Sequence, residues 1–244
     1  MRPITNVFPK EMFPIGSYPS IEWVLAEAVA SGCTDIAVVI GPRKSIIKEY
    51  LTTCCPKLAE YCQLSFLVQS EPFGLGHALI LAREFCAGHP VAVLLPDNLV
   101  AGSPLPLVQI ADSFLSLGGA VFTLVQESPT TAKWAGRLQL HQVDRQTYAA
   151  RPQSDRRTSV SPTPQLAGFG RYLLSPECLD QAQRLWHGPR IDELDDSLIF
   201  QHMAAAAQPV HGVLVEGQCF DISTVDGYIA AWQTLGRGKP AAIL

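Results

Sequence analysis

Two aspartates stand where a protein could hold a divalent cation. Asp97 follows the apolar run 91–95, and Asp221 ends another predicted strand ahead of a helix. Open α/β sheets bind ligands at the carboxyl ends of their strands. If the fold brings both carboxylates together, they suit Mg²⁺, which takes one or two carboxylates plus substrate phosphates. Aspartate is also an ordinary turn and helix-capping residue, so a capping role for each stays open.

A second candidate is the segment from Gln69 to Ala78, which joins a predicted strand to a predicted helix. Gly74 and Gly76 would let backbone N–H groups approach a ligand at the positive end of that helix. The third glycine of a dinucleotide-binding fingerprint is absent, because Leu79 stands at its position. The residues by themselves therefore fit either a ligand-binding loop or a tight turn.

Several other catalytic patterns are missing from the sequence. It contains no Gly-x-Ser-x-Gly elbow, no Gly-x-x-x-x-Gly-Lys-Ser/Thr loop and no His-Glu-x-x-His helix. The acidic run 192–196 opens a predicted helix. Such a run is more typical of residues that complement the helix dipole than of a metal site.

The composition is that of a folded protein. The 244 residues suit one α/β domain, and a hydrophobic share of 48% with a charged share of 16% excludes general disorder. A net charge of −4 gives no electrostatic basis for binding nucleic acid or an anionic membrane. An anionic ligand must therefore be met by a few placed cations.

The sequence predicts a cytoplasmic protein. It shows no basic-then-apolar leader, and no apolar run approaches the roughly 18 residues of a membrane span. The seven cysteines form no Cys-x-x-Cys pair and no zinc-like cluster. They are typical of the reduced, mostly buried thiols of a cytoplasmic chain.

Helices and strands alternate through the first half of the chain. This pattern predicts right-handed βαβ units and a mostly parallel sheet. Residues 1–18 are expected to form a loop because of their closely spaced prolines. After them we expect strands at 36–40, 64–69, 91–95 and 120–125, with helices near 20–31, 44–53, 77–87 and 105–117.

The second half of the chain has a different pattern. Residues 151–164 are polar and rich in Pro, Ser and Arg, which predicts an exposed, mobile loop. Around it we expect strands near 136–143, 166–174 and 210–216, with helices near 175–186, 192–207 and 224–235.

Taken in chain order, five segments resemble the motifs of the sugar-1-phosphate nucleotidyltransferases, most closely the bacterial uridylyltransferases among them. Each motif is weak alone, but together they are in register over essentially the whole chain. The segments are Pro9-Lys10-Glu11-Met12 with Pro14, Gln69 with Gly74-Leu75-Gly76-His77-Ala78, Leu95-Pro96-Asp97-Asn98, Gly170-Arg171-Tyr172-x-Leu174-Ser175, and Phe220-Asp221-Ile222 with Gly227-Tyr228.

The resemblance implies a fold and an activity. The fold would be a Rossmann-like, three-layer α/β domain with a mostly parallel central sheet and a smaller sugar-binding part. Residues 1–244 would form a single domain, with a nucleotide-binding half at 1–130 and a sugar-binding half at 131–244. The activity would transfer UMP from UTP to glucose 1-phosphate, giving UDP-glucose and pyrophosphate. Use of dTTP or another hexose 1-phosphate stays open, and oligomers are usual in the family.

The resemblance also implies roles for individual residues. Asp97 and Asp221 would hold Mg²⁺, and Lys10 would hold phosphate oxygens. Gln69, Gly74 and Gly76 would contact the nucleotide. Gly136 and Gln165 would contact the sugar phosphate.

The chain departs from the family pattern on the sugar side. Ala150-Arg151-Pro152 stands where the family has Glu-Lys-Pro, so Arg151 is expected to take the lysine's catalytic place, although its geometry differs. Ala150 removes a carboxylate that would bind sugar hydroxyls. Gln165 replaces an asparagine, and Ser223 replaces a glycine.

A further departure lies at the start of the chain. The family's first strand and its G-x-G-T-R loop would lie upstream of Met1, so two strand edges of the sheet are expected to be unpaired. Two interpretations stay open. Met1 is an internal residue of a longer enzyme, or the chain is a catalytically degenerate relative that acts as a nucleotide-sugar-binding or regulatory protein.

Overall fold

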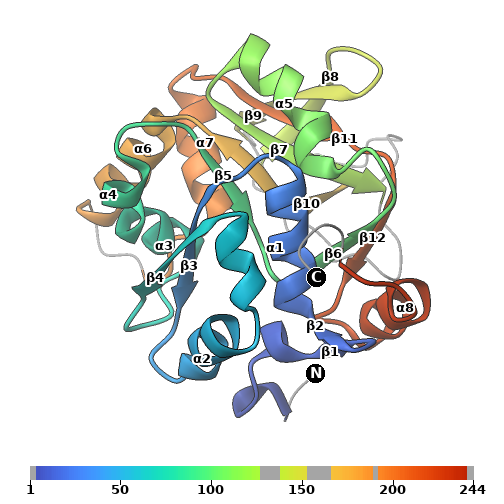
Figure 1. Ribbon diagram of the computed structural model, residues 1–244. Helices are drawn as coiled ribbons and strands as arrows, with labels where there is room; N and C mark the ends of the chain where they lie inside the picture. The colour runs from blue at the N-terminus through green and yellow to red at the C-terminus, as the bar shows by residue number, and fades with distance from the viewer. Residues whose placement is uncertain (1–3, 127–137, 153–165, 189–191, 241–244) are drawn as a thin grey trace.

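The computed structural model describes residues 4–126, 138–152, 166–188 and 192–240 (Figure 1). Gly136, Gln165 and most of the predicted loop 151–164 lie outside the described residues. The helices are α1 (Ser20–Ala30), α2 (Ser45–Thr53), α3 (Leu75–Leu81), α4 (Arg83–Cys86), α5 (Pro106–Leu117), α6 (Pro176–Trp186), α7 (Asp196–Ala205) and α8 (Val225–Leu235).

The central sheet has six strands in the order β5-β10-β7-β11-β9-β8. They are β5 (Val91–Leu94), β7 (Ala120–Gln126), β8 (Leu138–Gln142), β9 (Thr147–Pro152), β10 (Leu166–Leu174) and β11 (Val210–Leu214). Among the described residues, the β7–β11 pairing is the only parallel one in this sheet. The sheet is therefore mixed, and the prediction of a mostly parallel sheet is wrong. The reason lies in the second half of the chain, which inserts β10 between β5 and β7 and adds the β8–β9 hairpin at the edge.

Three smaller ladders surround this sheet. Strands β3 (Asp35–Ile40) and β4 (Gln63–Val68) pair in parallel, as the βαβ pattern predicts. Among the described residues, β3 pairs only with β4 and β5 only with β10, so each has one unpaired edge. The other ladders are antiparallel and join β1 (Pro14–Ile15) to β2 (Tyr18–Pro19) and β6 (Asn98–Ala101) to β12 (Gln218–Asp221).

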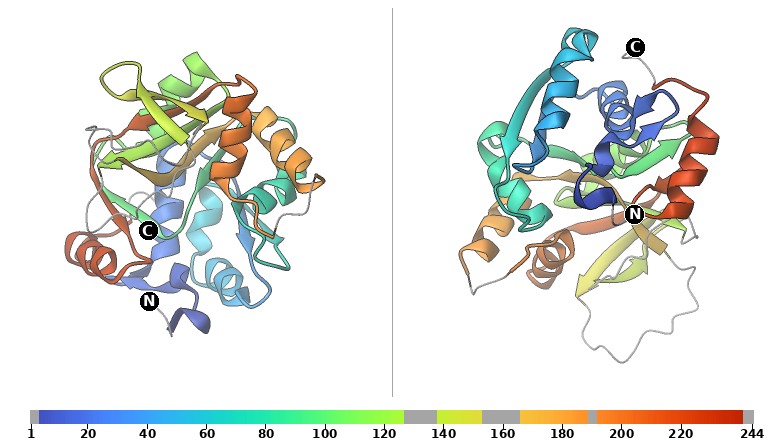
Figure 2. Two further views of the ribbon diagram at one scale, coloured as in Figure 1. Left: turned by 180° about the vertical axis from the view of Figure 1, so that it is seen from behind. Right: turned by 90° about the horizontal axis from the view of Figure 1, so that it is seen from below.

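Both faces of the central sheet are covered. Along β7, Phe122 and Leu124 face one core cluster that includes residues of α6 and α7. The alternate residues Val121 and Val125 face a second cluster that includes residues of α5. Figures 1 and 2 show α1 in front of the sheet and α7 behind it. The expected three-layer α/β fold is therefore present. Successive side chains of β7 point to opposite faces of the sheet, so apolar residues at both sets of positions bury both faces.

The ends of the helices follow local sequence signals. Helix α5 begins with Pro106 and stops at Gly118, whose φ of 66° is readily adopted by glycine. The Asp195 carboxylate accepts a hydrogen bond from Leu198 N and caps α7, so the acidic run serves the helix start as predicted. Residues 4–19 contain two short 3₁₀ turns and the two-residue strands β1 and β2, so the predicted loop at 1–18 is not loop alone where the structure describes it.

Each helix in the described part of the chain is too short or too polar to span a membrane.

The β7 core gives a stability prediction. Leu124 is fully buried, so Leu124→Ala should lower the free energy of unfolding by about 2–5 kcal/mol through lost packing and a cavity. The matched control is Leu115→Ala on the surface of α5, where the side chain is 82% exposed and the change should stay within about 0.5 kcal/mol. Urea unfolding measures both. Equal effects of the two substitutions would contradict the assigned core.

Candidate active site

The structure brings the two predicted metal aspartates together. Asp97 lies in the turn between β5 and β6, and Asn98, the first residue of β6, stands opposite Asp221 in the β6–β12 ladder. The backbone N–H of Ile222 donates to the carbonyl of Asp97 at 2.9 Å. A short antiparallel ladder therefore joins strand ends that are far apart in sequence.

Lys10 lies at the same place. Its ammonium group forms an ion pair with the Asp97 carboxylate, and both side chains are partly exposed, at 33% and 17%. Burial by itself would lower the pKa of Lys10. The neighbouring carboxylate of Asp97, with smaller effects from Glu11 and Asp221, outweighs that effect, so the pKa of Lys10 is raised. Lys10 is thus held as a cation between acidic groups.

Asp221 is buried, with 4% of its surface exposed. Its Oδ1 accepts hydrogen bonds from the backbone N–H and the hydroxyl of Ser223, at 2.9 and 2.6 Å. The cap of α8 is Thr224, whose hydroxyl accepts from Gly227 N at 3.0 Å. The helix cap is therefore Thr224, while Asp221 uses Oδ1 to stabilise the turn at Ser223. The other carboxylate oxygen, Oδ2, is the one that could bind a ligand.

The donor set fits a magnesium ion. Two carboxylates from adjoining strand ends are hard oxygen ligands, and Lys10 shows that a cation is already favoured beside Asp97. No group of three or more His, Cys, Asp or Glu side chains with the spacing of a metal site occurs among the residues with described positions. The other ligands of an ion held by Asp97 and Asp221 would then be substrate oxygens and water, as is usual for magnesium.

A second ion pair supports the segment that carries Lys10. The carboxylate of Glu11 accepts from Lys44 at 2.6 Å, and Lys44 follows β3 at the start of α2. Glu11 is buried, and its Oε2 has no hydrogen-bond partner in the described part of the chain. This pair ties residues 10–12 to the carboxyl end of β3.

Gln69 follows the last residue of β4, and its backbone N–H donates to Ile40 O at the end of β3. The side-chain Nε2 lies 3.0 Å from the carbonyl of Gly74 and 3.1 Å from Nδ1 of His77. Burial lowers the pKa of His77, which favours the neutral ring. A neutral Nδ1 can accept from the Gln69 amide, so His77 holds Gln69 in one orientation.

Packing against Leu194 explains why Gly74 and Gly76 in this loop are glycines. Gly74 has φ +91°, and a Cβ there would lie 2.5 Å from the carbonyl oxygen of Leu194. A Cβ on Gly76 would lie 2.4 Å from Leu194 Cγ, and the backbone N–H of Gly76 donates to Leu194 O at 2.8 Å. Contact with the segment before α7 thus requires glycine at both positions. Nucleotide contacts at Gly74 and Gly76 stay predictions.

Arg151 is not brought into this group. It is exposed near the end of β9, and three strands lie between β9 and β5 in the sheet. Its catalytic role stays a prediction, as do the substrate contacts of Gly136 and Gln165. An open cavity bounded by Arg145, Glu216 and Gln218 contains none of the predicted site residues that the structure describes.

Several residues that support the site have no role that the sequence predicts. His77 and Arg171 lie inside quoted motifs, and Lys44 follows the strand β3. The only signal in the sequence for Arg171 is a charged residue within the apolar strand 166–174, a position where charge needs a partner. Its partner Glu27, on α1, could not be found from spacing.

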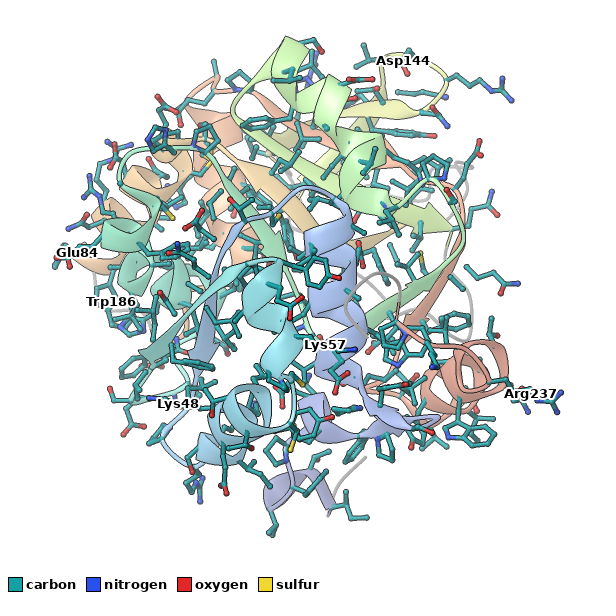
Figure 3. All side chains as sticks on the ribbon, viewed as in Figure 1. Lys48, Lys57, Glu84, Asp144, Trp186 and Arg237 are labelled. Atoms are coloured by element: carbon teal, nitrogen blue, oxygen red, sulfur yellow. The ribbon has the colours of Figure 1, made fainter. Side chains whose placement is uncertain are left out.

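Charged side chains elsewhere are spread around the molecule. Figure 3 shows Lys48, Glu84, Asp144 and Arg237 pointing outward from separate segments. Both signs of charge are therefore mixed on this view of the described chain. The positive charge near the aspartates comes from individual side chains such as Lys10. This agrees with the expectation, from a net charge of −4, that single cations must meet an anionic ligand.

Comparison with known proteins identifies relatives over nearly the whole chain. The UTP–glucose-1-phosphate uridylyltransferase YngB of Bacillus subtilis is 25% identical over 98% of this chain and 86% of its own length. A crystal structure of UDP-glucose pyrophosphorylase complexed with UDP-glucose is 23% identical with a TM-score of 0.81, covering 98% of this chain and 94% of that one.

A third relative is UTP-bound UGPase from Acinetobacter baumannii, at 25% identity and a TM-score of 0.75 over 98% of this chain and 90% of that chain. The family described as Nucleotidyl transferase matches residues 1–237. These matches confirm the predicted fold and the prediction of a nucleotidyltransferase-type enzyme. Over nearly its full length, this chain belongs to the nucleotidyl transferase family.

Proposed function

We propose that this protein transfers UMP from UTP to glucose 1-phosphate, giving UDP-glucose and pyrophosphate, with Mg²⁺ as cofactor. The observation that carries the proposal is the group formed by Asp97, Asp221 and Lys10 at the end of β5. Two carboxylates and one ammonium group at a strand end suit a reaction between two polyanions. The relatives named as uridylyltransferases support this choice of substrates.

The proposed reaction is an in-line displacement. A phosphate oxygen of glucose 1-phosphate attacks the α-phosphorus of UTP, and the bond to the pyrophosphate leaving group breaks. Both substrates are anions, so catalysis requires positive charge aimed at the reacting phosphates. Lys10 would supply one such charge, because its ammonium group can bind phosphate oxygens of the substrates. A Mg²⁺ ion held by Asp97 and Asp221 would supply Lewis-acid stabilisation of the developing negative charge.

Base recognition is assigned to the loop after β4. Gln69, oriented by Gly74 and His77, would hydrogen-bond the pyrimidine. Gly74 and His77 use both N–H groups of the Gln69 amide, so its Oε1 is left to accept a hydrogen bond from the N3–H of the pyrimidine. Structures of relatives bound to UTP and to UDP-glucose support a uridine nucleotide here.

A second candidate is a relative that binds the nucleotide sugar without turning it over. Ala150 favours it, because this residue is buried in the core and offers no carboxylate to sugar hydroxyls. The two candidates share a binding site and differ in turnover. Calorimetric binding of UDP-glucose together with an absence of pyrophosphate release would favour the regulator.

The proposed substrates also suggest where in the cell the protein acts. We place the protein in the cytoplasm, where nucleotide substrates occur, and its seven cysteines are all unpaired in the structure. A homo-oligomer stays a prediction from the family.

The first prediction concerns the metal site. Asp97→Asn and Asp221→Asn each keep the side-chain shape but remove a negative charge. Each should lower kcat for UDP-glucose formation by about 10²–10³-fold, the loss typical of one preorganised electrostatic group. Pyrophosphate release measures the rate. The control is Asp226→Asn, an exposed carboxylate at the start of α8, which should keep the wild-type rate. Full activity in the Asp97→Asn, Asp221→Asn double variant would reject the assigned site.

The second prediction concerns pH. Burial lowers the pKa of His77, so the neutral, accepting ring is present above its ordinary pKa of about 6.5 and is lost as the pH falls through the lowered value. Protonated Nδ1 becomes a donor and cannot accept from Gln69. The affinity for UDP-glucose should therefore be flat from pH 8 to 6.5 and then fall about three- to tenfold, the value of one hydrogen bond.

Calorimetry with UDP-glucose tests this, since its pyrophosphate diester does not titrate in that range. His77→Leu should weaken binding and remove the pH dependence. The control His89→Leu changes an exposed histidine and should keep the dependence. A wild-type affinity that stays constant down to pH 5 would count against the role given to His77.

A further inference from the structure

Arg171 is an arginine buried within the central sheet. It lies on β10 and has no exposed surface. The β10–β7 register shifts between Phe169 and Tyr172, so a bulge places Gly170 and Arg171 at the end of β5. A Cβ on Gly170 would lie 2.5 Å from Leu95 Cβ and from Asn98 Oδ1, so glycine is needed for this close approach.

Every N–H of the Arg171 guanidinium is used. Nε and Nη2 donate to the two carboxylate oxygens of Glu27 at 2.8 and 2.6 Å, forming a bidentate pair with a buried side chain of α1. The remaining donors reach backbone carbonyls. Nη1 lies 3.1 Å from Leu95 O and 2.9 Å from Gly170 O, and Nη2 lies 2.7 Å from Asn98 O.

These contacts enclose the turn that carries Asp97. The carbonyls of Leu95 and Asn98 lie on either side of Pro96-Asp97, and Arg171 binds both. Gly170 binds the same two residues: its carbonyl accepts from Leu95 N at 2.8 Å, and its N–H donates to Asn98 Oδ1 at 2.7 Å. The turn is thus fixed at both ends, while the Asp97 side chain is left to face Lys10.

The carboxylate of Glu27 balances the positive charge of the Arg171 guanidinium. An unpaired guanidinium next to the turn would compete with a metal ion and with Lys10 for the Asp97 carboxylate. The Glu27 carboxylate neutralises Arg171 and fixes its plane. The pair therefore holds the backbone through directed hydrogen bonds without adding net charge beside the site.

We propose that Arg171, held by Glu27, is a positioning residue that sets the Asp97 carboxylate for metal binding. The inference rests on the proposed metal site at Asp97 and Asp221. A purely structural pair would behave differently, because a buried ion pair can often be replaced by apolar residues with little loss of stability. Replacing both partners separates the two roles.

The experiment compares three variants with the wild-type chain. Arg171→Met combined with Glu27→Leu removes the pair and leaves no unpaired buried charge. Arg171→Lys keeps the charge but loses the planar fork. The matched control is Tyr172→Phe at the next residue of the same strand, which removes a partly buried hydrogen bond of 2.7 Å from the Tyr172 hydroxyl to Asp196. Two quantities are measured on each variant. They are the amide hydrogen exchange of Leu95, Asp97 and Asn98, and the Mn²⁺ affinity in saturating UDP-glucose by electron paramagnetic resonance.

We expect the double variant to fold, to exchange the amides of Leu95, Asp97 and Asn98 faster, and to bind Mn²⁺ about 10–100-fold more weakly. Arg171→Lys should show the same directions, and Tyr172→Phe neither. Unchanged exchange or unchanged Mn²⁺ affinity in the folded double variant would overturn the proposal, as would full wild-type behaviour of Arg171→Lys.

Two remaining outcomes are also decisive. If the double variant does not fold, Arg171→Lys decides by the same two measurements. If the wild-type chain binds UDP-glucose but no Mn²⁺, the metal part of the proposed function fails. Hydrogen exchange then still shows whether Arg171 holds the turn, so the two failures are distinguishable.

Discussion

The site depends on two like charges being held close together. Asp97 and Asp221 come from adjoining strand ends, and their carboxylates would repel each other without a cation nearby. Lys10 supplies that cation in the structure, and the raised pKa of its ammonium group reflects the favourable interaction. The same negative charge is what would attract a magnesium ion. The arrangement is therefore poised for a cation before any substrate binds.

The surrounding fold keeps this charge in place through backbone contacts. The β6–β12 ladder sets the distance between the strand ends, and Arg171 with Glu27 holds the turn before β6. These groups are buried, so their hydrogen bonds are not screened by water.

The loop after β4 shows how one sequence feature can serve two purposes. Gly74 and Gly76 fit the expectation of a nucleotide loop, yet both also face Leu194 at distances that only glycine permits. A glycine pattern reports that the backbone comes close to something, without saying what that is. Here a neighbouring segment accounts for the close approach, while Gln69 and His77 carry the polar groups suited to a base.

The sequence by itself determined the α/β class and nearly every helix, and it singled out Asp97 and Asp221 as candidate ligands at strand ends, because apolar periodicity and turn residues are local signals. The family resemblance added Lys10 and implied that the three residues share one site. Only the tertiary structure decided the mixed sheet, the pairing of Asn98 with Asp221 and the partner of Arg171. Strand order and buried ion pairs arise from contacts between residues distant in the chain, and no local spacing encodes them. For the same reason the sequence could not show that Arg151, whose catalytic role stays a prediction, lies on β9 with three strands between it and β5.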